Sequence, residues 1–109
     1  MSKIIINADD LGYSKKVNFE IEEYIRKGVV TSSTLMANAP EFDGGVKIAH
    51  LYPNVSVGVH LNLIEFKPLT NIYTFRKYGL IDENDNYKEG AIFVTPIDST
   101  LEKAITEEW

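Results

Sequence analysis

Residues 3–12 read Lys-Ile-Ile-Ile-Asn-Ala-Asp-Asp-Leu-Gly, and this stretch decides the fold and points to a site. An apolar, Ile-rich run ends in two adjacent carboxylates, Asp9 and Asp10, and then in Gly12. The run predicts a buried strand over residues 3–8. Because binding and catalytic groups gather at the carboxyl ends of parallel strands in α/β proteins, the two aspartates are candidate functional residues.

Helices and strands alternate after this first strand. Ser14 is an expected N-cap, and apolar residues at helical spacing predict a helix that ends near Lys27. A second strand is expected over residues 31–37, a second helix over residues 40–50 and a third strand over residues 55–61. Short connections between alternating strands and helices require a parallel sheet, so we expect an α/β fold with parallel βαβαβ order.

His60 stands at the end of the third expected strand, on the face that it shares with Ser56 and Gly58. Together with Asp9 and Asp10 it suggests a metal site at two strand ends. Two neighbouring carboxylates repel each other, and a cation or a bound proton would offset that repulsion. One carboxylate would bind the cation and the other would act as general base. Oxygen and nitrogen ligands suit Mg, Mn, Zn or Fe without choosing among them.

The competing structural explanations are ordinary ones. Aspartate is common in turns that follow strands, which accounts for one of the two carboxylates better than for both. A buried histidine bonded to a backbone carbonyl would account for His60 on its own. Tyr13, Asn38 and Asn62 follow the three expected strands. Tyr13 either stacks on a sugar or covers the rim, and each asparagine either lines the rim as a substrate contact or makes a turn.

The rest of the chain has a different character, although we treat residues 1–109 as a single partial α/β domain. Residues 62–97 combine turn residues with short apolar runs, which indicates a long excursion or a small hairpin subdomain. The sequence Ser-Thr-Leu-Glu from Ser99 has the form of a capping box and predicts the start of a helix over residues 98–109. No C-cap signal precedes Trp109, so we expect that the natural sequence continues, or once did.

Composition excludes several classes of protein. A net charge of −5 without a Lys/Arg cluster argues against a nucleic-acid partner. The absence of cysteine excludes a disulfide scaffold and a thiolate metal site. Neither a signal peptide nor an apolar run of membrane-spanning length is visible, so we expect a cytoplasmic protein without a membrane partner. An open sheet with uncovered edges predicts a homo-oligomer, most simply a homodimer.

Three stretches carry a family resemblance: Asn7 to Ser14, Gly28 to Asn38 and Val57 to Leu63. In order and spacing they resemble the YdjC-type carbohydrate deacetylases, which include enzymes that remove N-acetyl groups from chitooligosaccharides. The match spans residues 4–70. It implies a (β/α) barrel-like deacetylase fold, of which this chain would be the N-terminal part, and a hydrolase of carbohydrate metabolism.

The resemblance also implies roles for individual residues. Asp10 and His60 would be metal ligands and Asp9 the catalytic base. The cofactor would be a divalent ion, with Mg favoured and Zn or Mn as alternatives, that polarises the acetamide carbonyl of an N-acetylated oligosaccharide and stabilises the oxyanion. Phe66 stands where the family usually has a small residue. A later Asp-Ser-His motif, with the third ligand, is absent, so we expect the isolated chain to be inactive.

Two other classes of protein compete with this hypothesis. A receiver-like phospho-acceptor domain also alternates strands and helices and has an acidic pair after its first strand. It requires an aspartate at the end of its third strand, where this chain has His60. The second alternative is a non-catalytic assembly fragment, which a measurement of metal occupancy would distinguish from a deacetylase.

Overall fold

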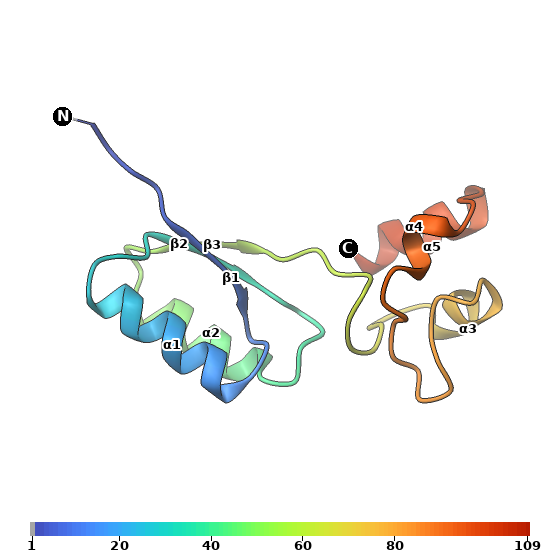
Figure 1. The fold of residues 1–109 in the computed structure, drawn as a ribbon, viewed down its shortest axis with the longest axis horizontal. Coiled ribbons are helices and arrows are strands. Elements are labelled where there is room, and N and C mark those ends of the chain that lie inside the picture. The colour runs from blue at the N-terminus through green and yellow to red at the C-terminus, as the bar shows by residue number, and fades with distance from the viewer. Residues whose placement is uncertain (1) are drawn as a thin grey trace. The chain divides into compact units, whose positions relative to one another are not determined.

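The computed structural model describes residues 2–109, which divide into two compact units at His60 (Figure 1). The first unit is a three-stranded parallel sheet with two helices packed on one face (Figure 1). The predicted βαβαβ order is confirmed. Its elements are β1 (Asn7–Leu11), α1 (Lys15–Arg26), β2 (Ser32–Leu35), α2 (Phe42–Leu51) and β3 (Ser56–Val59).

The order of the strands decides between two of the folds considered above. In a receiver-type, doubly wound sheet the first strand lies between the second and third, and helices cover both faces. Here β2 lies between β1 and β3, so each strand pairs with the next one along the chain. Sequential neighbours with helices on one face are the arrangement of a (β/α) barrel. The sheet is therefore incompatible with the receiver-like alternative.

An apolar cluster holds the two helices against the sheet. Ser14 caps α1 as predicted, because its side chain accepts a hydrogen bond from the Val17 N–H at 3.1 Å. Burial of one aliphatic side chain contributes roughly 1.5–3 kcal/mol, so this cluster supplies much of the stability of the unit. Its buried members are Leu11, Ile21, Ile25, Val30 and Ile48.

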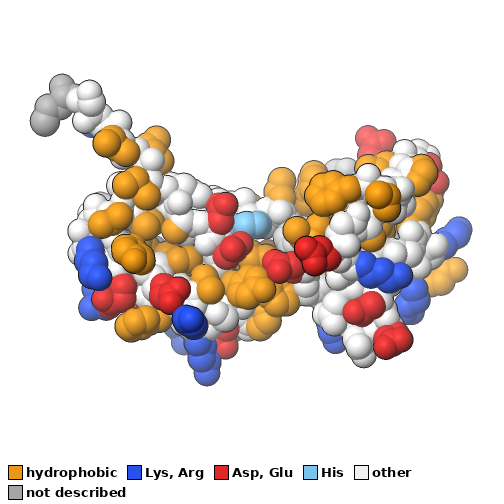
Figure 2. Space-filling view, viewed as in Figure 1, with side chains coloured by type: hydrophobic (Ala, Val, Ile, Leu, Met, Phe, Trp, Pro, Cys, Tyr) orange, Lys and Arg blue, Asp and Glu red, His pale blue; other side chains and the backbone are white. Residues whose placement is uncertain are grey.

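Only the end of the Ile-rich run belongs to the sheet. β1 begins at Asn7, and the side chains of Ile4 and Ile5 are 77% and 81% exposed. The reason is that β2, the strand that pairs with β1, begins only at Ser32. Ile6 is the first residue of the Ile-rich run whose carbonyl accepts a hydrogen bond from the Ser32 N–H. The predicted buried strand over residues 3–8 is therefore wrong in its bounds and its burial. Figure 2 shows hydrophobic side chains exposed along this N-terminal segment.

The other strands and the second helix are also shorter than predicted. β2 covers only Ser32–Leu35 and β3 only Ser56–Val59, while α2 begins at Phe42 rather than at residue 40. β1 and β3 are the edge strands of this sheet. The predicted homodimer stays a prediction. Within residues 2–109 no helix has the length and apolar character needed to cross a membrane.

The second unit packs around its own core. It contains α3 (Ile72–Lys77), α4 (Ala91–Val94) and α5 (Ser99–Glu108). An antiparallel bridge joins Ile81 to Tyr87, and the predicted long excursion or small hairpin subdomain stays a prediction. The two short helices α3 and α4 were not expected. The rings of Phe75 and Tyr87 meet edge to face, with centroids 5.5 Å apart. That both units form one partial domain stays a prediction.

Asp98, not Ser99, is the N-cap of α5. Its backbone is extended, and its carboxylate accepts from the Leu101 N–H at 2.9 Å. The second carboxylate oxygen accepts from the Tyr78 hydroxyl at 2.5 Å. The predicted cap is therefore displaced by one residue, because Asp98 also binds a side chain from outside the helix.

Buried Asn18 ties the end of β1 to the start of α2. Its Oδ1 accepts from the Gly12 N–H at 2.7 Å, and its Nδ2 donates to the Glu41 carbonyl at 3.1 Å. Gly12 has a φ of +96°, in the left-handed region that favours glycine. A Cβ added at Gly44 would lie 2.9 Å from Nδ2 of Asn18, so this glycine leaves room for the amide.

Asn18→Ala should destabilise the protein by about 1–3 kcal/mol, because it leaves the buried Gly12 N–H without an acceptor. Urea unfolding monitored by circular dichroism measures this loss. Glu20→Ala on the same helix is the matched control and should change the free energy of unfolding by less than about 0.5 kcal/mol. Equal unfolding midpoints for the two variants would contradict the role given to Asn18.

The hydrogen bond from Tyr78 also predicts a pH dependence. This bond, with the one from the Leu101 N–H, lowers the pKa of Asp98 below its usual value of 3.8. The ionised carboxylate therefore stabilises the folded state above the unfolded-state pKa, and this contribution is lost as the pH falls through the lower folded-state pKa. Tyr78→Phe should destabilise the protein at neutral pH, and the difference from wild type should shrink in acid. Urea midpoints measured across this range test it, and a constant difference would refute it.

Candidate functional site

Polar side chains line the face of the sheet that α1 and α2 leave uncovered. Successive side chains of a strand point to opposite faces, so Asn7 and Asp9 share one face of β1. The register pairs Asn7 with Ser32, which places Ser32 and Thr34 of β2 on the same face. Ser56 and Gly58 of β3 continue it. The polar face predicted for β3 thus continues across all three strands.

A β-bulge in β1 brings the two adjacent carboxylates to one side. Ala8 pairs with Ser33 but Leu11 pairs with Leu35, so β1 has one extra residue in this interval. Asp10 lies in this interval with a φ of +71°, a left-handed conformation that aspartate tolerates better than most residues. In a regular strand Asp9 and Asp10 would face opposite sides of the sheet. The bulge lets Asp10 approach His60 on the face that already carries Asp9.

A chain of short contacts joins the three strand ends. Oδ1 of Asp9 accepts from Nδ2 of Asn7 and from the Thr34 hydroxyl, each at 2.8 Å. The Thr34 oxygen lies 3.0 Å from Nδ1 of His60. Oδ1 of Asp10 lies 3.6 Å from the same nitrogen. The structure thus brings together Asp9, Asp10 and His60, as their positions at strand ends predict, and the roles given to them stay predictions.

The donor set fits part of a cation site. A carboxylate and an imidazole lie side by side, and the side chains of Asp10 and His60 are 48% and 24% exposed, so solvent and ions reach both. Oxygen and nitrogen donors of this kind suit several divalent metals. Among residues 2–109, no group of three His, Asp or Glu side chains is arranged to hold a metal ion. These residues therefore fit as two ligands of an incomplete coordination shell.

Thr34 is the residue that sequence analysis missed. Threonine is common in strands, so its identity carried no functional signal. The available signal was the register: Thr34 of β2 pairs with Gly58, and its face alternation places it between Asp9 and His60. Only the combined alternation of three strands could have singled it out.

The three predicted substrate contacts lie in loops. The Tyr13 N–H donates to the Asp10 carbonyl at 3.0 Å and closes the turn after β1. Asn38 is half-buried in the turn after β2. Asn62 lies in the second unit, where its side chain organises its own loop through Ile64 and Glu65. The contacts of Asn62 are those of a turn-forming residue, and contact with a sugar stays a prediction for all three.

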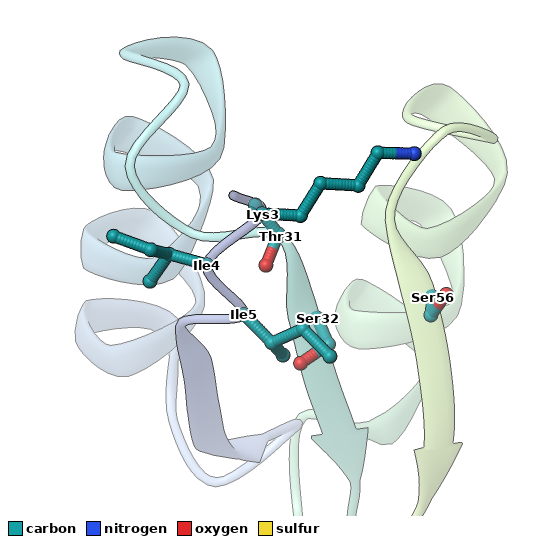
Figure 3. Close-up of a pocket in the computed structure, with 6 residues that line it drawn as sticks. All are labelled: Lys3, Ile4, Ile5, Thr31, Ser32 and Ser56. Carbon is teal, nitrogen blue, oxygen red and sulfur yellow. The ribbon is translucent and has the colours of Figure 1, made fainter. Parts of the chain in front are cut away.

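A hollow of about 640 Å³ in the first unit does not belong to this site. It lies at the amino ends of the strands, whereas Asp9, Asp10 and His60 mark the carboxyl ends. Figure 3 shows the residues that line it, and none is a candidate catalytic or metal-binding residue: Lys3, Ile4, Ile5, Thr31, Ser32 and Ser56.

Comparisons with known proteins agree with the resemblance. The family described as YdjC-like protein matches residues 3–109. A carbohydrate deacetylase of Geobacillus stearothermophilus is 42% identical over 76% of this chain and 32% of its own length. Carbohydrate deacetylase 1 of Listeria innocua is 38% identical over 97% of this chain and 40% of its own. A chitooligosaccharide deacetylase of Citrobacter koseri is 40% identical over 72% and 31%. The chain thus spans 31% to 40% of the length of these relatives.

The left-handed backbone at the bulge predicts an unusual order of stability among Asp10 variants. Asp10→Gly should be more stable than Asp10→Ala by about 1 kcal/mol, because alanine is strained at positive φ whereas glycine is not. At an ordinary strand position the order is reversed, since glycine costs conformational entropy. Thermal or urea unfolding of the two variants measures the difference. A more stable Asp10→Ala would show that the bulge does not hold Asp10 in this conformation.

Proposed function

This chain belongs to the YdjC-like family, and on that basis we propose that its protein is a metal-dependent hydrolase that removes N-acetyl groups from amino-sugar oligosaccharides. Its relatives carry the names carbohydrate deacetylase and chitooligosaccharide deacetylase. The observation that supports the proposal most directly is the meeting of Asp9, Asp10 and His60 through contacts of 2.8–3.6 Å. An assembly fragment without catalytic function has no need of such an arrangement.

In this proposal Asp10 and His60 hold a divalent cation, with Mg favoured and Zn or Mn as alternatives. The cation would supply a Lewis acid for the acetamide carbonyl of the substrate. Because residues 2–109 contain no group of three such side chains, Asp10 and His60 would share the cation with further ligands from other groups. Tyr13 and Asn38 follow β1 and β2, and we assign them to contacts with the sugar, together with Asn62.

Asp9 is proposed as the general base. Both hydrogen bonds that it accepts end on Oδ1, which leaves Oδ2 without a partner among residues 2–109. The Asp9 side chain is exposed on the polar face of the sheet, so water and substrate can reach Oδ2. Asn7 and Thr34 fix the orientation of the carboxylate, and Oδ2 can take the proton of an attacking water.

The proposal predicts that the full-length protein releases acetate from short N-acetylglucosamine oligomers, and that EDTA abolishes and Mg²⁺ restores this release. Asp9→Asn should lower kcat by about 10²–10⁴-fold and leave metal affinity nearly unchanged, because it removes a proton acceptor and no ligand. His60→Ala should weaken metal binding itself. Acetate release measured by NMR and Mn²⁺ binding measured by electron paramagnetic resonance separate these effects.

Asp43→Asn is the matched control, since it removes one exposed carboxylate from the first turn of α2. It should leave both acetate release and metal affinity at the wild-type level. Activity that survives EDTA, or no release from any N-acetylated sugar when metal is supplied, would refute the proposed function. Equal loss of metal binding in Asp9→Asn and His60→Ala would refute the division of roles.

A further inference from the structure

Thr34 occupies the centre of the site, and its single hydroxyl contacts two of the residues discussed above. Its oxygen lies 2.8 Å from Oδ1 of Asp9 and 3.0 Å from Nδ1 of His60. A threonine hydroxyl has one hydrogen to donate, whereas an ionised aspartate has none. The positions of the hydrogens in this chain of contacts can therefore be worked out.

The hydrogen of Thr34 must lie on the Asp9 side. Two oxygens 2.8 Å apart without a hydrogen between them would repel each other, and Thr34 is the donor of this pair. With its one hydrogen used, the Thr34 oxygen can only accept from His60. Nδ1 of His60 must then carry a hydrogen.

The residues next to His60 and next to Asp9 support this placement of the hydrogens. Oδ1 of Asp10 lies 3.6 Å from Nδ1 of His60, and a carboxylate oxygen attracts an N–H but repels a lone pair. At the other end, the Ser32 hydroxyl donates to Oδ1 of Asn7 at 2.8 Å, and Nδ2 of Asn7 donates to Asp9. The amide of Asn7 is thereby oriented so that the Asp9 oxygen receives hydrogens from both sides.

We propose that Thr34 is a positioning residue that holds neutral His60 in the Nδ1–H tautomer, which leaves the lone pair on Nε2. The hydrogen bond made by one ring nitrogen sets the state of the other, as it does for metal-binding histidines in general. The part of the inference that concerns metal rests on the proposed function: the cation would bind Nε2, and Asp10 would have to turn its carboxylate away from Nδ1 to share it. Thr34 therefore aligns the base Asp9 and the ligand His60 with a single hydroxyl.

The tautomer can be read directly from long-range ¹H–¹⁵N correlation spectra of the imidazole nitrogens in metal-free protein. The spectra are recorded at about pH 8.5, above the usual histidine pKa of about 6.5. The chain contains two histidines, so His50 serves as an internal reference. We expect a protonated Nδ1 and an unprotonated Nε2 in His60. Thr34→Val, which keeps the β-branched shape, should move the hydrogen toward Nε2, and Thr34→Ser should restore the wild-type pattern.

A wild-type His60 with its hydrogen on Nε2, or a pattern that Thr34→Val leaves unchanged while backbone spectra show a folded protein, would overturn the inference. Addition of Zn²⁺ to the wild type should then shift Nε2 of His60 more than Nδ1. Binding of Zn²⁺ through Nδ1 would also overturn it. If Zn²⁺ shifts neither nitrogen, the proposed metal site fails, whereas the assignment of Thr34 stands on the metal-free spectra.

Discussion

The bulge in β1 is the constraint on which the site depends. A regular strand would direct Asp10 toward the face that packs on α1 and α2, where an unpaired carboxylate is costly to bury. One extra residue in β1 and a positive φ at Asp10 instead place the Asp10 carboxylate 3.6 Å from Nδ1 of His60, while Asp9 is linked to the histidine through Thr34. The strand end is then held by Asn18, which binds the N–H of Gly12 and the carbonyl of Glu41. The position of the carboxylates and the attachment of the helices are therefore parts of one local structure.

The sheet separates two kinds of chemistry by its faces. One face carries aliphatic side chains that pack under α1 and α2, and the other carries the hydrogen-bonded polar chain from Ser32 to His60. Sequential strand order with α1 and α2 on one side leaves the polar face uncovered by these two helices. In a (β/α) barrel that face lines the interior. The carboxyl ends of the barrel strands form the rim where active sites are found. The arrangement of these three strands thus agrees with both the family and the chemistry proposed for it.

Local signals in the sequence predicted the features that depend on local physics. The Ser14 cap and the apolar spacing of residues 17–25 define α1, and the strand ends with Asp9, Asp10 and His60 were located from the same periodicity. Strand bounds were missed because they depend on a partner: Ile4 and Ile5 have no paired strand beside them. The cap of α5 lies at Asp98 rather than Ser99, because the Asp98 carboxylate also accepts a hydrogen bond from the Tyr78 hydroxyl, which no local sequence signal indicates. Thr34 was missed because its role arises only from the register of three strands.

The polar chain across the sheet also has a direction, since each hydrogen along it lies on a defined side of its bond. Ser32 donates to Asn7, and Asn7, Thr34 and His60 pass their hydrogens toward Asp9. A replacement that reverses donor and acceptor at one position leaves two acceptors or two donors facing each other at the next. In evolution these positions should therefore change together or not at all, so that substitutions in β1, in β2 and at the end of β3 are coupled.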